Sequence, residues 1–482
     1  MTLDKPDILI FLSDQHHANY AGVMGETSIR TPNIDQLAKD GVVFDNAYTG
    51  CPLCVPARSS FLSGQLPSKN GVFDNEGCLA GDQATFIHSL AASGYETVLC
   101  GRMHFLGEDQ RHGFTKRIFG EFTPLFWGRS GEARKDLGPY VGKCSEPGCL
   151  DIIGGGNSPV LEYDRAVIQA AKGYLSQRHD KPQCVLVGTY GPHFVYVSPP
   201  ELYKYYQGIV GIPRHNQRNT NYSHPLLEAK RREVDDERIV KARAAYYGMI
   251  ETLDTHLGDL RTQWDDYLAR SQRTGVFLYV SDHGDQAGEH HMFGKQTFYE
   301  GSAKIPLIFQ GSGMVRNQRI KGCVSFMDIG PTLCDLVGAT VLPEQDGKSL
   351  IHQITTGEDD EPDRAVFSEF MDSTSEGDYV LGAMVRQREW KLVSYSQFES
   401  NDLLFNLTDD PFETTNLTAI YPDKYRELKE LLVSRSNPEA AISQYVNKQQ
   451  YRQILGEWGR NSDVAEEERW VVPANATYLP EY

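Results

Sequence analysis

The sequence lacks long hydrophobic runs. No stretch approaches the roughly 18 consecutive apolar residues that a membrane-spanning helix needs. The first seven residues lead directly into a short apolar run at 8–12, without the basic start, longer apolar stretch and small-residue cleavage site of a secretory signal. We therefore expect a cytoplasmic protein that does not bind a membrane.

Positive charge is also scarce. Lysine and arginine number 47 against 65 aspartates and glutamates, so the formal net charge is −18. This balance argues against a nucleic-acid partner and leaves no basic stretch for a membrane surface. An acidic protein that binds an anionic substrate must concentrate its cations locally, in the motifs described below.

A disulfide framework is absent as well. The nine cysteines are an odd number and lack the spacing of a disulfide scaffold. Cys51 and Cys54 form a Cys-x-x-Cys pair, but there is no second pair to complete a zinc ribbon. The neighbouring Pro56 and Arg58 do not suit the helix start of a thioredoxin-like redox pair.

What is present is a globular composition, with 482 residues of which 40% are hydrophobic. Short apolar runs at 8–12, 184–188 and 276–280 read as buried strands, and longer periodic segments at 161–177 and 235–260 read as helices. Strands that alternate with helices predict an α/β fold, with a mostly parallel sheet flanked by helices.

The pattern changes from about residue 361. Shorter alternating runs predict a small antiparallel sheet, followed by a helix at 424–434 and a polar tail from 444. We therefore predict a catalytic domain at 1–360, and a C-terminal α+β subdomain with its tail at 361–482.

Polar clusters follow four of the strand-like runs. In open α/β sheets, ligands bind beyond the carboxyl ends of the strands. The sequence therefore predicts an active site at this edge, built from the segments 13–17, 101–104, 189–193 and 281–285.

One further segment carries a recognisable motif. Cys54-Val-Pro-Ala-Arg58 has the order Cys-x-Pro-x-Arg and is followed by an apolar stretch that ends at Gly64. It resembles the type I sulfatases of the alkaline-phosphatase-like superfamily. The resemblance implies that a maturation enzyme oxidises Cys54 to formylglycine, with the pentapeptide as the modification signal.

The resemblance extends over nearly the whole chain, in the family's order, and is nearest to its choline-sulfatase-like branch. The first strand ends in Asp14-Gln15, and Gly101-Arg102-Met-His104 resembles the family's Gly-Lys-x-His with Arg102 in place of lysine. Further matching segments with site residues are Gly191-Pro-His193, Ser281-Asp282-His283-Gly284 and Gly294-Lys295, and the segments at 31–35, 41–48, 325–333 and 402–411 also resemble the family.

The resemblance implies one divalent metal ion, Ca²⁺, Mn²⁺ or Mg²⁺. Such hard cations prefer oxygen ligands. The implied ligands are Asp14, Gln15, the side chain at position 54, Asp282 and His283.

The implied reaction is the hydrolysis of a sulfate ester. One hydroxyl of the hydrated formylglycine attacks sulfur, and the other then loses its proton to regenerate the aldehyde and release sulfate. Arg58 would hold this diol, while Arg102 and Lys295 would bind the sulfate oxygens. His104 would help to remove the diol proton, and His193 would protonate the leaving oxygen.

Several alternatives stay open at this point. The substrate is an alkyl or aryl sulfate, with choline sulfate among the candidates. A phosphonate monoester or phosphodiester hydrolase of the same superfamily would use the same machinery, and an inactive binding relative would need lost ligands, which are not seen. His16 and His17 lie close enough to Asp14 to line the pocket, whereas His290 and His291 read as loop residues.

The aromatic tail bears on assembly. It would reach a neighbouring subunit of a homo-oligomer or wrap its own surface, and its aromatic residues are Trp458, Trp470, Tyr478 and Tyr482.

Overall fold

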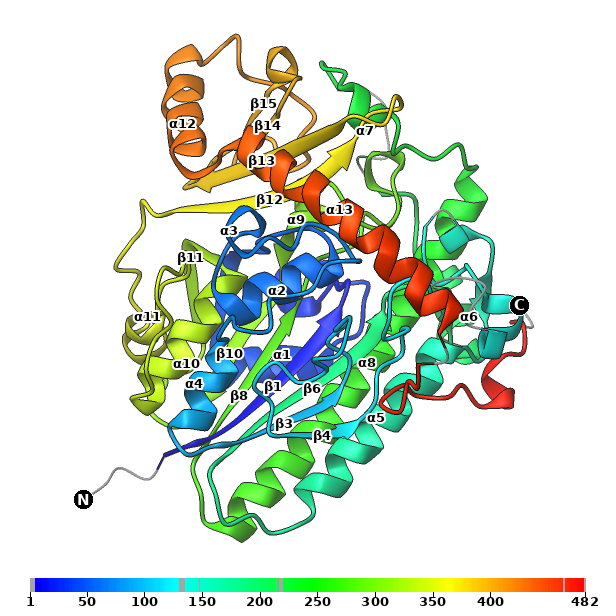
Figure 1. The fold of residues 1–482 in the computed structure, drawn as a ribbon, viewed down its shortest axis with the longest axis vertical. Coiled ribbons are helices and arrows are strands. Elements are labelled where there is room, and N and C mark those ends of the chain that lie inside the picture. The colour runs from blue at the N-terminus through cyan, green and yellow to red at the C-terminus, as the bar shows by residue number, and fades with distance from the viewer. Residues whose placement is uncertain are drawn as a thin grey trace.

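The computed structural model describes residues 5–129, 135–146, 148–213, 215, 220–462 and 464–480. Within these residues the main feature is a nine-stranded sheet in the order β11-β2-β10-β8-β1-β6-β3-β4, with β9 paired to β2 (Figure 1). The strands are β1 Asp7–Asp14, β2 Val42–Tyr48, β3 Glu96–Gly101, β4 Lys116–Phe119, β6 Gln183–Pro192, β8 Gly275–Ser281, β9 Lys304–Ile305, β10 Leu307–Gly311 and β11 Gln318–Ser325. Strands β9 and β10 pair antiparallel and the other pairs are parallel, which confirms the predicted mostly parallel sheet.

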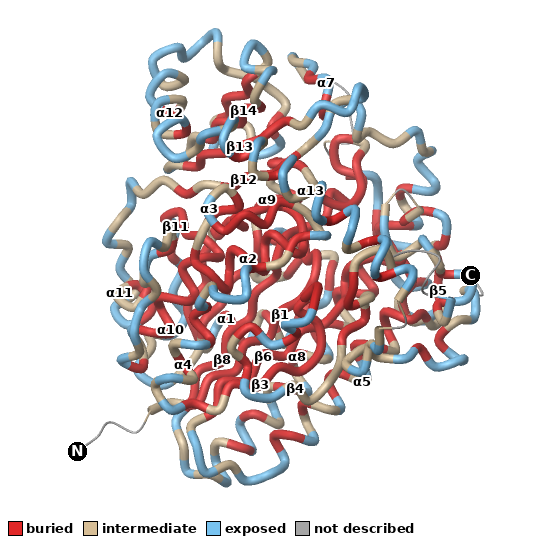
Figure 2. The backbone as a smooth tube through the Cα atoms, viewed as in Figure 1, coloured by how far each residue is buried: buried red, intermediate tan, exposed pale blue. Residues whose placement is uncertain are grey.

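Helices cover both faces of this sheet (Figure 1). They are α1 Pro32–Lys39, α2 Cys54–Ser63, α3 Pro67–Asn70, α4 Phe86–Ala92, α5 Pro159–Leu175, α6 Pro200–Gln207, α7 Pro225–Glu228, α8 Asp236–Ser271, α9 Glu300–Ala303, α10 Ile329–Val337 and α11 Ile351–Thr356. A short parallel pair, β5 Ile153–Gly155 and β7 Tyr196–Ser198, lies beside α6 and α8. The buried backbone is concentrated in the sheet and in the inner faces of the helices (Figure 2).

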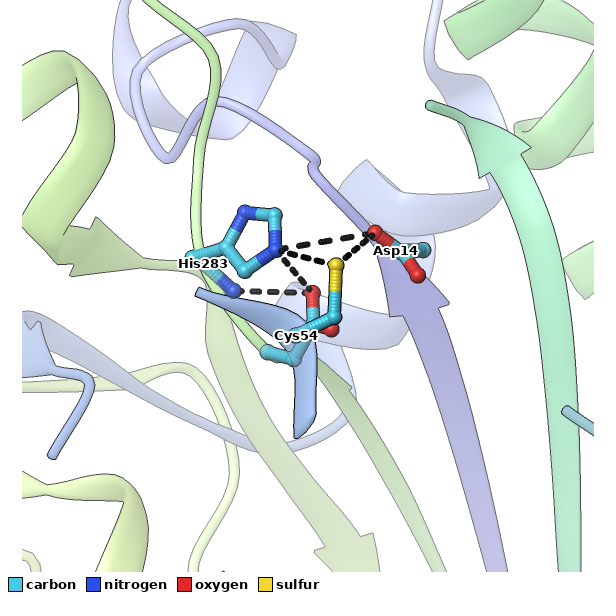
Figure 3. A group of neighbouring side chains, drawn as sticks. Asp14, Cys54 and His283 are labelled. Carbon is cyan, nitrogen blue, oxygen red and sulfur yellow. Dashed lines mark hydrogen bonds and ion pairs between the residues drawn. The ribbon is translucent and has the colours of Figure 1, made fainter. Parts of the chain in front are cut away.

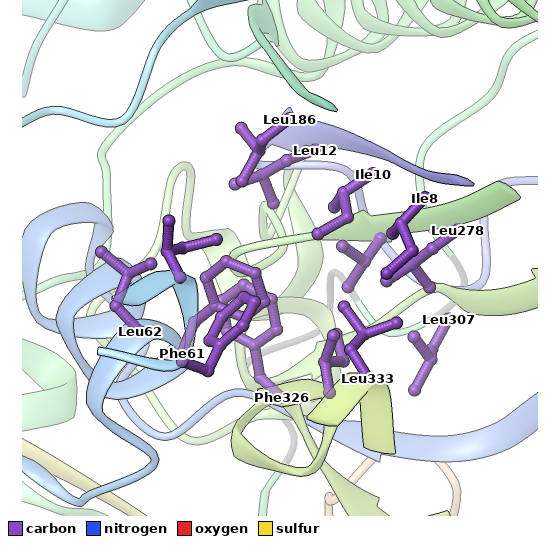
Figure 4. Close-up of a cluster of buried hydrophobic side chains, with 14 of the residues drawn as sticks. Ile8, Ile10, Leu12, Phe61, Leu62, Leu186, Leu278, Leu307, Phe326 and Leu333 are labelled. Carbon is purple, nitrogen blue, oxygen red and sulfur yellow. The ribbon is translucent and has the colours of Figure 1, made fainter. Parts of the chain in front are cut away.

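Strand β1 shows why the sheet is buried on both sides. Its side chains alternate, so Ile8, Ile10 and Leu12 pack with residues of α2, α4 and α10 (Figure 4). Leu9 and Phe11 point to the other face, against α1, α5 and α8. A strand covered on both faces reads as a continuous apolar run, which is the pattern at 8–12.

Helix α8 confirms the predicted long amphipathic helix. The Asp235 side chain caps its start by accepting a hydrogen bond from the backbone N–H of Arg238. The helix continues to Ser271, beyond the predicted end at 260. The six apolar residues at helical spacing are all buried, namely Ile239, Ala242, Ala245, Met249, Leu253 and Leu257.

The smaller sheet is antiparallel, as predicted, with the order β12-β13-β14-β15. Its elements and the helices beside it are β12 Ala365–Ser373, β13 Tyr379–Gln387, β14 Trp390–Tyr395, β15 Leu403–Asn406, α12 Pro422–Arg435 and α13 Pro438–Asn461. The first part of the polar segment from 444 is not an irregular tail: up to Asn461 it belongs to α13, which crosses from the small sheet back to the large domain (Figure 1). There Lys448 donates to the Gly71 carbonyl at 2.7 Å. The division at residue 360 stays a prediction.

The aromatic tail packs at least partly on its own chain. The Trp470 ring lies 5.3 Å from that of Tyr163 on α5, centroid to centroid, whereas Tyr478 is exposed. Tyr482 lies outside the described residues. Among the helices that the structure describes, none combines the length and hydrophobicity needed to cross a membrane.

Candidate active site

Five separate segments meet at one edge of the large sheet. Asp14 ends β1, and Arg102, His193 and Asp282 are the first residues after β3, β6 and β8. Because these strands are parallel neighbours, their carboxyl ends lie side by side. Cys54 is the first residue of α2, a helix in which all ten residues are buried. The predicted convergence is therefore found.

A potential metal site surrounds the Cys54 thiol. Ligand atoms of Asp14, Cys54, Asp282 and His283 all lie within 4.8 Å of one another, and all four residues are buried. His283 Nε2 is 3.2 Å from Cys54 Sγ and 3.7 Å from Asp14 Oδ1 (Figure 3). It is 3.6 Å from Asp282 Oδ1. Two carboxylates and one imidazole around a small buried space suit a hard divalent cation.

The His283 ring has the tautomer that a metal ligand needs. Its Nδ1 lies 3.0 Å from the Gly284 carbonyl oxygen, which can only accept a hydrogen bond. The proton of a neutral ring is therefore on Nδ1, and Nε2 keeps its lone pair for the cluster.

Two buried arginines hold the outer oxygens of the carboxylates. Arg58 donates from Nε to Asp282 Oδ2 at 2.9 Å and from Nη2 to Asp14 Oδ2 at 3.1 Å. Arg102 Nε donates to the same Asp14 oxygen at 2.6 Å. Burial opposes ionisation of Asp14, but the nearby cations, Arg102 first, outweigh it and hold the pKa of that carboxyl well below its usual range. Asp14 is thus a carboxylate with Oδ1 facing the cluster.

Gln15 lies beside the site and contacts Lys295. Its Oε1 accepts a hydrogen bond from Lys295 Nζ at 2.6 Å, and its Nε2 donates to Asp285 Oδ2 at 2.6 Å. The predicted role of this amide oxygen as a metal ligand stays a prediction, since in this structure the oxygen faces the lysine.

Lys295 places a cation next to Cys54. Its Nζ lies 3.2 Å from Cys54 Sγ and 2.6 Å from His193 Nε2. Burial and the Asp14 carboxylate oppose ionisation of Cys54, but Lys295 and His283 outweigh them and lower the pKa of the thiol.

His193 accepts a hydrogen bond at Nε2 and does not donate one there. Burial, reinforced by Lys295, holds the pKa of His193 well below its usual range. Its Nδ1 lies 2.9 Å from the Phe194 carbonyl oxygen, so the proton of the neutral ring is on Nδ1. The ammonium of Lys295 therefore donates to His193 Nε2, and the pair shares one proton next to residue 54.

Arg102 and His104 are joined directly. Arg102 Nη2 lies 2.9 Å from His104 Nδ1, and the guanidinium lies 4.2 Å above the ring centre of Tyr190. Burial and Arg102 lower the pKa of His104 well below its usual range, so the ring is neutral.

Three buried carboxylates that no sequence motif singles out support these residues. Glu121 binds the backbone of His104, Asp164 binds the backbone N–H groups of Tyr190 and Gly191, and Asp285 binds Gln15. Asp285 ends one of the predicted polar clusters, which is a signal for it. Glu121 and Asp164 follow no motif, so no signal in the sequence identified them.

The histidines next to the motifs point elsewhere. His17 Nε2 pairs with Glu289 at 3.2 Å, and His16 Nε2 lies 3.0 Å from the Tyr20 carbonyl oxygen. His290 stacks on Tyr299, with ring centroids 4.0 Å apart. None of these contacts leads to the Cys54 cluster.

A cavity of about 350 Å³ opens above the cluster. Its inner end is lined by Cys54, Arg102, His104, His193 and Lys295. Its lining also includes aromatic rings and two carboxyl groups, from Phe122, Phe126, Trp127, Tyr190, Phe194, Glu76 and Glu146. Tyr190 lies beside Arg102, and Phe194 lies beside Lys295. Cations and aromatic surface in one cavity suit an anionic group attached to a small organic part.

Known proteins that are similar to this chain in sequence are sulfatases. Residues 6–339 match the family model described as Sulfatase, and residues 288–438 match that of the N-sulphoglucosamine sulphohydrolase C-terminal region. The chain is 33% identical to a choline-sulfatase of Rhizobium meliloti over 86% of this chain and 83% of that protein. It is 28% identical to arylsulfatase K of Danio rerio over 97% of this chain and 91% of that one.

Solved structures show the same fold. The phosphonate monoester hydrolase of Agrobacterium radiobacter superposes with a TM-score of 0.72 at 22% identity, covering 89% of this chain and 95% of that one. A 2-O GAG sulfatase superposes with a TM-score of 0.70 at 22% identity, covering 98% of both chains. Since the Sulfatase model spans residues 6–339 and the choline-sulfatase aligns over most of both proteins, this chain belongs to the sulfatase family.

Proposed function

We propose that this protein hydrolyses an alkyl or aryl sulfate monoester and uses residue 54, converted from cysteine to formylglycine, as its nucleophile. One observation carries the proposal: Asp14 and the adjacent pair Asp282 and His283 come from two distant segments and surround Cys54, with all four ligand atoms within 4.8 Å of one another. Lys295 supplies a cation at 3.2 Å from the same side chain.

Asp14, Asp282, His283 and the side chain at position 54 would hold the divalent ion, with Gln15 beside them. Bound there, a Ca²⁺, Mn²⁺ or Mg²⁺ ion would lower the pKa of a hydroxyl on residue 54 and offset the charge of the sulfate group. Arg58 keeps both carboxylates in place through their outer oxygens.

The hydrated formylglycine has two hydroxyl groups, and each serves one half of the reaction. The first attacks sulfur and the bond from sulfur to the alcohol oxygen breaks. The second loses its proton, the carbon–oxygen bond to the sulfo group breaks, and the aldehyde returns as sulfate leaves. The Lys295–His193 pair holds a shared proton beside residue 54, so it is positioned to protonate the departing alcohol.

The cavity suggests which alcohols fit. Trp127 and Phe126 offer aromatic faces, and the carboxyl groups of Glu76 and Glu146 line the same cavity, that of Glu146 paired with Arg232 at 3.3 Å. Aromatic faces and carboxylates together suit a cationic group. The Rhizobium relative is named a choline-sulfatase. Choline sulfate is therefore a candidate substrate, beside other small alkyl and aryl sulfates.

The test has two parts, on protein produced together with a formylglycine-generating enzyme. Mass spectrometry of the peptide that contains residue 54 should show an aldehyde in place of the thiol. That protein should hydrolyse 4-nitrophenyl sulfate and choline sulfate faster than a phenyl phosphonate ester, and a Cys54→Ala variant should hydrolyse none of them. Converted protein that prefers the phosphonate ester would support the phosphonate hydrolase instead, and converted protein inactive on all three would contradict the proposal.

We also propose that the protein forms a homo-oligomer. Helix α13 exposes Tyr451, Ile454 and Trp458, which lie three and four residues apart and so on one side of the helix. Light scattering coupled to size-exclusion chromatography would measure the mass, and a mass of 54.1 kDa, that of one chain, would contradict this proposal.

A further inference from the structure

The contact between Arg102 and His104 determines which nitrogen of the histidine carries its proton. A guanidinium has only donors, so His104 Nδ1 must accept the hydrogen bond from Arg102 Nη2 at 2.9 Å. A neutral imidazole has one N–H, which must then lie on Nε2. His104 lines the inner end of the cavity and can offer a donor there, but no free lone pair.

Arginine at position 102 makes this arrangement possible. Its three nitrogens contact three groups: Nε donates to Asp14 at 2.6 Å, Nη1 to Glu121 at 3.4 Å and Nη2 to His104 at 2.9 Å. A lysine at this position has one nitrogen and would not span all three. Arginine in place of lysine therefore links His104, through Arg102, to the Asp14 carboxylate of the metal cluster.

Glu121 fixes the other side of His104. Its Oε2 accepts the backbone N–H of His104 at 2.7 Å and that of Met103 at 3.1 Å. The φ angle of His104 is +58°, in the left-handed region that a residue with a side chain seldom adopts. Two hydrogen bonds to one fully buried carboxylate oxygen hold the backbone in this conformation.

Glu121 is itself held by the C-terminal segment. Its backbone N–H donates to the Glu468 carbonyl at 2.7 Å, and its own carbonyl accepts from Trp470 N–H at 2.8 Å. The residue thus connects the end of the chain to the closed end of the cavity.

We propose that Glu121 is a positioning residue which, together with Arg102, holds His104 as a hydrogen-bond donor from Nε2 to a sulfate oxygen of the substrate. His104 then does not remove the diol proton, the role that the family resemblance implied. The Lys295–His193 pair beside residue 54, having given a proton to the departing alcohol, accepts the diol proton instead. The inference rests on the proposed sulfatase activity. The hydrogen bond from His104 Nε2 stabilises charge on the sulfo group while the bond to the alcohol oxygen breaks. This hydrogen bond therefore accelerates the first half of the reaction.

Two substitutions at position 104 test the donor role in converted enzyme. Glutamine supplies an N–H near the position of Nε2 and cannot act as a base, whereas alanine removes both functions. We expect His104→Ala to lower kcat/KM by about 100- to 1,000-fold, as for the loss of one preorganised donor, and His104→Gln to stay within about tenfold of the wild type. After quenching with substrate present, neither variant should accumulate protein carrying a sulfo group. If His104→Gln is as slow as His104→Ala, or if either variant accumulates the sulfated protein, the donor role is wrong.

A double-mutant cycle tests the positioning role of Glu121. Glu121→Gln should lower kcat/KM by roughly 10- to 100-fold alone but cause no further loss in the His104→Ala background, because the two residues act as a unit. The matched control is Glu369→Gln, which alters an equally buried carboxylate that binds Ser68 outside the site and should leave kcat/KM unchanged. An unchanged rate in Glu121→Gln, or an equal loss in both backgrounds, would overturn the assignment. Wild-type turnover is measured first, so that failure of the sulfatase proposal is seen separately.

Discussion

Replacing Arg58 with alanine should destabilise the protein, and by an amount that depends on bound metal. Arg58 is 1% exposed and donates to Asp282 at 2.9 Å, to Asp14 at 3.1 Å and to the Arg102 carbonyl at 3.0 Å. Removing one partner of a buried ion pair costs about 3–5 kcal/mol, because the remaining charge stays buried without compensation. Asp14 keeps its bond to Arg102, so the uncompensated charge falls mainly on Asp282 and we expect about 3 kcal/mol.

A divalent cation should reduce this loss. The ion would lie against the inner oxygens of the same two carboxylates and offset the charge that Arg58 leaves behind. Chemical denaturation followed by tryptophan fluorescence would give the loss once in EDTA and once in millimolar Ca²⁺. We expect a larger loss in EDTA.

Arg364 provides the matched control. It donates to Asp328 at 2.8 and 2.6 Å and its side chain is 8% exposed, but its partner is not in the metal cluster. Arg364→Ala should therefore lose a comparable amount, equal in EDTA and in Ca²⁺. A loss below about 1 kcal/mol for Arg58→Ala in EDTA, within the range of ordinary surface changes, would refute the reasoning, as would an identical loss with and without the ion.

Three further predictions concern other parts of the chain. Asp254 on α8 accepts the backbone N–H groups of Asn33 and Ile34, and burial raises its pKa to about 6. Because the pKa in the folded protein exceeds the ordinary aspartate value of 3.8, the stabilisation from the protonated form is present below about pH 4 and is lost as pH rises through 6. Thermal midpoints from pH 4 to 8 should show this decline in the wild type relative to Asp254→Asn, and parallel curves would contradict it. In Gly459→Ala the new Cβ would lie 2.0 Å from the Trp127 carbonyl oxygen, so α13 must separate from the cavity wall; KM should rise more than kcat falls, and unchanged kinetics would count against this view of the wall. Gly173→Ala, on the exposed side of α5 with open space at its Cβ, should instead stabilise the protein by about 0.5–1 kcal/mol without a kinetic effect, measured by the same denaturation assay.

The sequence by itself determined the main sheet and the positions of the site residues within it. Apolar runs such as 8–12 and 276–280 are detectable because both faces of a central strand are buried, so nearly every residue is apolar. Polar residues directly after such runs, Asp14 and Asp282 among them, must then lie at one edge. Local pattern and strand direction together are sufficient for this inference.

Only the tertiary structure decided which groups touch. Arg102 pairs with Asp14, 88 residues away, and Glu121 supports His104 through contacts that no local pattern encodes. Helix α13 was missed for a related reason: its buried positions include Ala441, Arg452 and two glycines, so it has no apolar stripe that periodicity would reveal. Small and polar residues are buried there because they fit the surface opposite, and that surface exists only once the chain has folded.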